Sequence, residues 1–180
     1  PASARAILVG FSSVEASGTC VVNIISAGVI PAGMEMMDKA AIQAAEDFCN
    51  AGYPLDVEAL LIVELDGPEP EVDHLLQKVE EIAKTCGAIN IRASKSEEER
   101  LRFWAGRKAA FPAVGRISPD YYCMDGTIPR ARLPEVLATM TELSKKYDLR
   151  VANVFHAGDG NLHPLILYDA NKPSELDRAE

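Results

Sequence analysis

The chain has 180 residues, of which 48% are hydrophobic and 25% charged, a composition that is typical of a globular domain and excludes disordered and fibrous classes. The formal net charge of −9 argues against nucleic acid as a partner, because phosphate binding needs a basic surface. We therefore expect one folded unit over residues 1–180.

Cysteine usage and hydropathy bear on location. The four cysteines form no CxxC pair, which predicts reduced, buried thiols of an intracellular protein, with a four-thiolate metal site or two disulfides as the alternative. The uncharged run 16–34 is nearly long enough to span a bilayer, but it contains Asn23 and Pro31 and predicts a buried helix followed by a strand. We expect a cytoplasmic protein without a transmembrane segment, any membrane association being peripheral and through partner subunits.

Hydrophobic periodicity and helix boundaries predict two strand–helix–strand units in the first half of the chain. Ser13 is a candidate helix cap, Pro70 lies in a first helical turn, and Gly52 and Gly87 end helices. The predicted elements are a strand over 4–11, a helix over 13–28, a strand over 29–38, a helix over 38–51, a strand over 58–67, a helix over 68–87 and a strand over 88–94. This order favours the α+β class: an antiparallel sheet with helices packed on one face, built from duplicated ferredoxin-like strand–helix–strand units.

The second half predicts two more helices, a tyrosine-rich strand and a hairpin. The pattern from Ser94 to Glu97 is typical of a capping box, and the helix that it opens is expected to end near Pro112. The predicted elements are a helix over 94–111, a strand over 119–130, a helix over 132–148 and hairpin strands over 151–156 and 163–169.

The segment HAGDGNLH, residues 156–163, places two imidazoles at the ends of a glycine-bearing turn. Strands of a hairpin lie about 5 Å apart, so His156 and His163 can face one point. Gly158 and Gly160 permit positive φ and close backbone approach. Two histidines begin a metal site, but a catalytic zinc site normally takes about three protein ligands. Metal binding and a glycine turn whose histidines only form hydrogen bonds are therefore two open interpretations.

Four motifs together resemble the C-terminal cap domain of FAD-linked oxidases: EALLIVELDG, WAGRKAAFPA, SPDYYCMDGTIPR and HAGDGNLHP. The resemblance covers essentially the whole chain. The family groups the FAD subunit of glycolate oxidase, to which the motifs are most similar, with D-lactate and D-2-hydroxyglutarate dehydrogenases. It implies that a separate domain holds FAD and that the cap covers the flavin and contacts a small 2-hydroxyacid, which is oxidised to the 2-oxoacid by hydride transfer. Residues 1–180 would then be one cap domain, a fragment that lacks the FAD domain and a C-terminal tail and is inactive alone.

The resemblance also implies roles for individual residues. His156 and His163 would ligate a divalent metal such as Zn, Mn or Fe in the members that use one. Arg107 would bind the substrate carboxylate, because a planar guanidinium meets both carboxylate oxygens, and the local excess of nine Lys and Arg over five Asp and Glu in residues 92–132 favours this over an ordinary exposed arginine. The further substrate-binding candidates are Lys108, Arg116 and Asn161. Catalytic and flavin-binding residues are expected outside this chain.

Two departures limit what the resemblance implies. The family's Ser-x-Glu-His-Gly motif, which supplies an acidic metal ligand and a catalytic histidine, does not occur in residues 1–180. The lysine that some relatives carry in the tyrosine-rich strand is replaced by Cys123 or Met124, which points away from dicarboxylate substrates.

The resemblance also implies partners, and two other functions remain as competing interpretations. We expect the protein's own FAD domain as a partner, together with other oxidase subunits, including an iron–sulfur subunit. The competing interpretations are a stand-alone ferredoxin-like module for small-ligand binding or assembly, and a metal hydrolase that uses the two histidines and Asp159.

Overall fold

The computed structural model describes residues 2–180 and consists of six α-helices, one short 3-10 helix and nine strands, listed here in chain order. The elements are β1 (Ala2–Phe11), α1 (Val14–Ser26), β2 (Gly33–Asp38), α2 (Lys39–Cys49), β3 (Ala59–Pro68), α3 (Glu69–Thr85), β4 (Asn90–Ala93), α4 (Glu97–Val114), β5 (Asp120–Cys123), β6 (Gly126–Thr127), η1 (Arg130–Arg132), α5 (Leu133–Tyr147), β7 (Arg150–His156), β8 (Asn161–Leu162), β9 (Pro164–Tyr168) and α6 (Glu175–Ala179). None of the helices in this described part is long and apolar enough to cross a membrane.

The strands form a single antiparallel sheet in the order β4-β1-β3-β2-β7-β8-β6, and β9 pairs with both β7 and β5. Its centre is the long pairing of β1 with β3, which runs from Ala2 opposite Pro68 to Phe11 opposite Ala59. The predicted α+β class with an antiparallel sheet is confirmed. The duplication of ferredoxin-like units stays a prediction.

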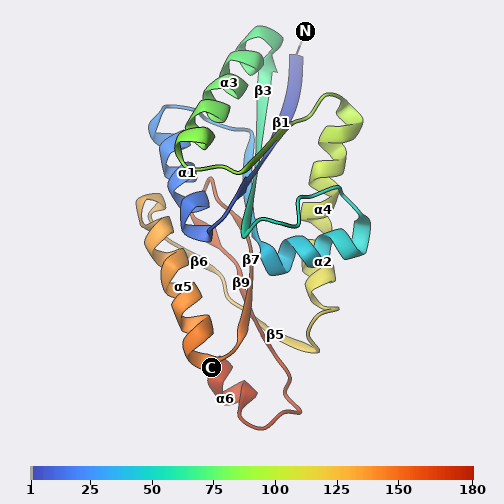
Figure 1. Ribbon diagram of the computed structural model, residues 1–180, viewed down its shortest axis with the longest axis vertical. Coiled ribbons are helices and arrows are strands. Elements are labelled where there is room, and N and C mark those ends of the chain that lie inside the picture. The colour runs from blue at the N-terminus through green and yellow to red at the C-terminus, as the bar shows by residue number, and fades with distance from the viewer. Residues whose placement is uncertain (1) are drawn as a thin grey trace.

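Helices cover both faces of this sheet, so the prediction of a single covered face is wrong. Figure 1 shows α1, α3 and α5 on one side and α2 and α4 on the other. The cause lies in the central strands, where consecutive residues are apolar over Ala6–Val9 and Leu60–Val63. Because successive side chains of a strand point to opposite faces, such runs need cover on both sides.

Several element boundaries differ from the sequence prediction. The cap of α4 is Ser96 rather than Ser94: the Ser96 hydroxyl accepts from the Glu99 N–H, and the Glu99 carboxylate accepts from the Lys95 N–H. Ser94 is instead buried, and its Oγ accepts from the Ala6 N–H, which ties β4 to β1. The serine cap therefore lies two residues later than predicted, and the Glu99 side chain closes onto the residue before the cap rather than onto the cap itself.

Two further boundaries differ for local reasons. Helix α4 continues through Pro112 to Val114, because Ala113 and Val114 are buried in a small cluster with β7 and β9 that holds the last turn in place. The predicted strand over 119–130 is divided into β5 and β6, which pair with different partners, β9 and β8.

All four cysteines are free thiols, but the prediction that they are buried is correct for only some of them. Cys20 is buried and Cys86 is half-buried, whereas Cys49 and Cys123 are exposed. Cys49 ends α2 and Cys123 ends β5, where each side chain reaches the surface.

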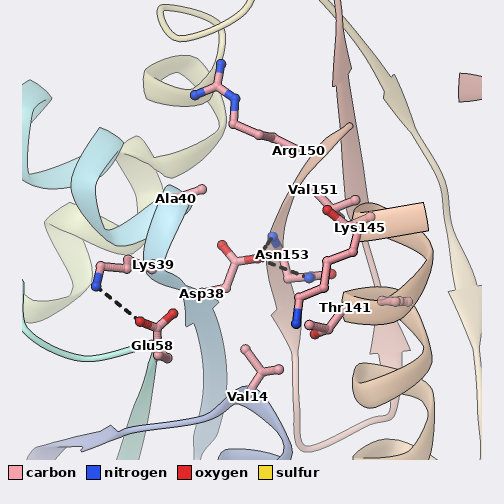
Figure 2. Close-up of a pocket in the computed structure, with 12 residues that line it drawn as sticks. Val14, Asp38, Lys39, Ala40, Glu58, Thr141, Lys145, Arg150, Val151 and Asn153 are labelled. Atoms are coloured by element: carbon pink, nitrogen blue, oxygen red, sulfur yellow. Dashed lines mark hydrogen bonds and ion pairs between the residues drawn. The ribbon is translucent and has the colours of Figure 1, made fainter. Parts of the chain in front are cut away.

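A buried carboxylate marks the junction of β2 and α2. Asp38 caps α2 by accepting from the Ala41 N–H at 3.2 Å, and its second oxygen accepts from the backbone and side-chain N–H groups of Asn153 at 2.7 and 3.1 Å. Figure 2 shows Asp38 and Asn153 pointing toward each other in a hollow that is also lined by Lys145. Burial raises the pKa of Asp38 to about 7, against the lowering effect of these hydrogen bonds.

Candidate functional site

Glu35 and His156 form the centre of the candidate site. They lie directly opposite each other in the antiparallel pairing of β2 with β7, at the point where β7 ends. Glu35 Oε1 is 2.6 Å from His156 Nδ1. Because a carboxylate only accepts hydrogen bonds, this contact places a proton on Nδ1 and leaves Nε2 of a neutral ring with its lone pair.

Arg107 contacts the same carboxylate from a helix that packs on this face of the sheet. It lies on α4, and its Nε and Nη2 are both 2.9 Å from Glu35 Oε2. The side chains of Arg107 and Glu35 are only 11% and 12% exposed, so the pair is shielded from solvent. The guanidinium also lies over the ring of Phe111, with 5.9 Å to its centroid. Arg107 is therefore a held, half-buried cation rather than a free helical arginine.

His163 lies next to His156, as the hairpin predicted. The two imidazole ring centroids are 5.6 Å apart at an interplanar angle of 84°. On its other side His163 meets the edge of Phe111, and its Nδ1 is 3.9 Å from Asp125 Oδ1. The structure thus brings together His156, His163 and Arg107, three residues that lie up to 56 positions apart in the sequence.

The glycine turn between the histidines is fixed by the backbone of a distant segment. Gly160 has φ +70°, and a Cβ atom added there would lie 2.4 Å from the carbonyl oxygen of Ile128. The Ile128 N–H donates to the Gly160 carbonyl at 3.0 Å, and Arg130 donates to the carbonyl of Gly158. Only glycine fits at position 160, which accounts for this residue in the motif.

The remaining predicted residues lie at varying distances from this cluster. Asn161 is opposite His156 in the β7–β8 pairing, and its Oδ1 is buried without a hydrogen-bond partner among residues 2–180. Lys108 is exposed and makes no ion pair within the described chain. Arg116 is exposed and stacks on Phe48 of α2, so it is held outside the cluster. Asn161 has the strongest geometric link to the site.

A second acid–arginine contact lies beside the first. Glu64 on β3 accepts from Arg100 at 2.6 Å and from the indole N–H of Trp104, both on α4. Arg100, Trp104 and Arg107 share one face of this helix, because residues four and seven apart are neighbours along it. The structure shows two carboxylates beneath this face, Glu64 and Glu35.

Sequence reasoning missed Glu35 and Glu64. Each acid lies between two apolar neighbours in its strand: Glu35 between Met34 and Met36, and Glu64 between Val63 and Leu65. A charge at such a position is unusual unless it is paired, and this was the available signal.

The metal prediction is not decided by this geometry. Among residues 2–180 no group of three or more His, Cys, Asp or Glu side chains is placed to hold a metal ion. Two adjacent imidazoles, one of them with Nδ1 bound to a carboxylate and Nε2 free, match the arrangement in which histidines bind metals. The residues present therefore fit as part of a metal site that takes its remaining ligand from elsewhere.

One hollow adjoins the cluster, and another beside the sheet surrounds Asp38. A hollow of about 250 Å3 is lined by Glu35 and His156 together with Arg130, Asp159 and apolar residues of α1 and the segment before β2. The hollow of Figure 2, about 270 Å3, surrounds Asp38 and contains none of the predicted site residues. The residues that line the first hollow do not include Arg107, His163 or Asn161.

The sequence matches the family model described as FAD linked oxidases, C-terminal domain, over residues 1–180. The glycolate oxidase subunit GlcD of Escherichia coli (strain K12) is 61% identical over the whole chain and is covered over 36% of its own length. GlcD of Bacillus subtilis (strain 168) is 31% identical, with 100% of the chain and 38% of the relative covered. A probable mitochondrial D-lactate dehydrogenase of Danio rerio is 31% identical over 99% of the chain and 36% of its length. The chain thus spans little more than a third of these relatives.

Solved structures resemble the fold at low sequence identity. A 4-ethylphenol oxidase from Gulosibacter chungangensis has a TM-score of 0.67 and 13% identity, over 98% of this chain and 42% of that one. A p-cresol methylhydroxylase with substrate bound has a TM-score of 0.66 and 14% identity, over 98% and 41%. At such identities the likeness concerns the fold alone.

Proposed function

The chain belongs to the family of FAD linked oxidases, C-terminal domain, and we propose that it is the substrate-side domain of a flavoprotein that oxidises a small 2-hydroxyacid of the glycolate or D-lactate type to the 2-oxoacid. FAD would be held by the part of the protein outside residues 1–180. The single observation that carries the proposal is the cluster of Arg107, His156 and His163 around Glu35.

Arg107 suits the substrate carboxylate. Its Nη1 makes no hydrogen bond within the described chain, while Nε and Nη2 are fixed by Glu35. A guanidinium that is already oriented loses little freedom when a second anion binds, and its low exposure strengthens the charge interaction. Asn161 lies opposite His156, and its side-chain carbonyl oxygen has no hydrogen-bond partner among residues 2–180, so it remains a substrate-binding candidate. Lys108 and Arg116 are weaker candidates because neither contacts the cluster.

His156 and His163 would hold a divalent metal such as Zn, Mn or Fe. A bound ion of this kind supplies Lewis-acid polarisation of the substrate hydroxyl. Glu35 keeps Nδ1 of His156 protonated and therefore directs Nε2 to the ligand position. The two imidazoles and Arg107 together would orient the hydroxyl and the carboxylate of one small acid.

Further parts of the proposal concern the whole protein. We propose partner subunits, among them an iron–sulfur subunit, and a cytoplasmic location with any membrane contact made through those partners. The stand-alone ligand-binding module is less favoured, because relatives with the same domain are named as oxidases and dehydrogenases.

The test uses the complete flavoprotein that contains this domain. Glycolate and D-lactate are titrated anaerobically while the flavin absorbance is recorded, with His156→Ala, His163→Ala and Arg107→Ala as variants. Arg102→Ala is the matched control, because Arg102 lies on the same helix but pairs with exposed Glu98 outside the cluster. We expect bleaching that the three site variants weaken and the control retains. Bleaching that is unaffected by all of the site variants would remove the site assignment, and no bleaching with either acid would remove the proposed substrate class.

A further inference from the structure

We propose that Glu35 is a positioning residue that locks Arg107 and His156 into one arrangement and sets the tautomer of His156. The role given to Glu35 rests on the proposed function, whereas the contacts of Glu35 do not depend on that function. Glu35 itself need not touch substrate, because both of its oxygens are already engaged: Oε2 with Arg107 and Oε1 with His156.

The setting of Glu35 is rigid. It lies within β2, between the neighbours Met34 and Met36, which are both buried, and it is paired on one side with His156 of β7 and on the other with Ile62 of β3. A side chain so placed has little freedom to leave its partners. The sheet therefore holds the backbone of Glu35 on both sides, and Arg107 and His156 hold its carboxylate.

The contact with His156 determines which ring nitrogen is available. At 2.6 Å from a carboxylate oxygen, Nδ1 must be the donor. Nε2 of the neutral ring is then the nitrogen that can accept a hydrogen bond or bind a metal. Without this contact both tautomers of a 47% exposed imidazole would be populated.

The contact with Arg107 has a different effect. An arginine with only 11% of its side chain exposed would be a poorly compensated charge if Glu35 were neutral. The guanidinium would then turn toward solvent or toward another acid. Glu35 thus keeps the cation beside the histidines while leaving Nη1 for another anion.

The chain provides a matched control in Glu64. It is likewise a strand carboxylate paired with an arginine of α4, with 18% of its side chain exposed, but it contacts no histidine. Glu35→Gln and Glu64→Gln therefore both remove one half-buried negative charge under the same helix. Only the first removes the partner of His156.

The first measurement is the tautomer of His156 in the complete protein with 15N-labelled histidine, freed of metal by a chelator, at a pH where the ring is neutral. His156→Gln assigns the signal. We expect Nδ1 to have the chemical shift of a protonated nitrogen and Nε2 that of an unprotonated one in wild type and in Glu64→Gln, and a shift toward mixed tautomers in Glu35→Gln. A wild-type ring protonated on Nε2 overturns the proposal without any variant.

The second measurement is zinc affinity, determined by competition with a chromophoric chelator. Loss of a carboxylate that orients a ligating histidine typically weakens metal affinity by about 10- to 100-fold, which we expect for Glu35→Gln and not for Glu64→Gln. Equal affinities for the two variants contradict the positioning role. If neither glycolate nor D-lactate bleaches the wild-type flavin, the proposed function fails, whereas the tautomer result still decides the role of Glu35.

Discussion

Replacing Asp38 by asparagine should abolish a pH dependence of stability that this one buried carboxyl imposes. Its pKa is raised from 3.8 to about 7 by burial, so the folded chain holds its proton where the unfolded chain has released it. Between pH 4 and pH 7 the folded state binds more protons, and the free energy of unfolding must fall as the pH rises. Below this window the group is neutral in both states, and above it the group is ionised in both.

The size of the effect follows from the two pKa values. A rise from 3.8 to about 7, at ~1.4 kcal/mol for each pH unit, corresponds to an upper bound of about 4 kcal/mol across the window. Asparagine is as good a helix cap as aspartate, so Asp38→Asn retains the contact with the Ala41 N–H, although it loses an acceptor for Asn153. The charged groups that line the same hollow are Lys39, Glu58, Lys145 and Arg150.

Urea unfolding of the 180-residue chain at a series of pH values measures this dependence. The difference in unfolding free energy between wild type and Asp38→Asn should decrease steadily from pH 4 to pH 7 and then level off. Glu58→Gln is the control, because Glu58 lines the same hollow but its side chain is 52% exposed in an ion pair with Lys39. A difference that is flat over this range, or that Glu58→Gln reproduces, would refute the reasoning.

Three other substitutions test the packing, each by urea unfolding at constant pH. Gly106→Ala should destabilise the fold by about 1–3 kcal/mol, because a Cβ atom would lie 2.3 Å from the hydroxyl oxygen of Tyr53. Gly160→Ala should cost more than ~1 kcal/mol, because φ is +70° and the Cβ would meet the Ile128 carbonyl; an unchanged midpoint would contradict the turn geometry. Phe155→Ala, at a fully buried side chain, should cost about 3–5 kcal/mol, and a loss below ~1 kcal/mol would show that the core is not packed as described.

The order of strands and helices could be predicted because the spacing of hydrophobic residues differs between helices and strands. Helix α3 combines acids in its first turn with buried Val72, Leu76 and Val79 spaced at three and four residues, and its bounds were predicted closely. The long apolar strand β3 was equally clear. The same apolar run also contained the information that was overlooked: with no polar alternation from Ala59 to Val63, helices had to cover both faces.

The local boundaries failed where a tertiary contact overrode a local pattern. Ser94 has the right spacing to Glu97 for a capping box, but its hydroxyl is engaged by the Ala6 N–H across the sheet. Pro112 should end a helix, yet the buried residues after it continue the helix for two positions. Neither partner could be identified from the neighbouring sequence.

In the candidate site, too, the sequence predicted local contacts but not contacts between distant segments. The histidines were predictable because a hairpin is local, with its two strands separated by a short turn. Glu35 was not, because its importance depends on the register of β2 against β7, which joins residues 121 positions apart.

The geometry of α4 explains why two carboxylates, and not one, lie beneath its arginines. Glu35 is paired with Ile62 and Glu64 with Gly33, so the two acids are one strand and two residues apart, which is about 8 Å from the usual strand spacings. Arg100 and Arg107 are seven residues apart on a helix, about 10 Å along its axis. A helix that crosses the sheet diagonally can therefore set each arginine over its own acid. Moving either acid by one residue would turn its side chain to the opposite face of the sheet, so that Arg107 would lose Glu35 or Arg100 would keep only its pair with Glu97.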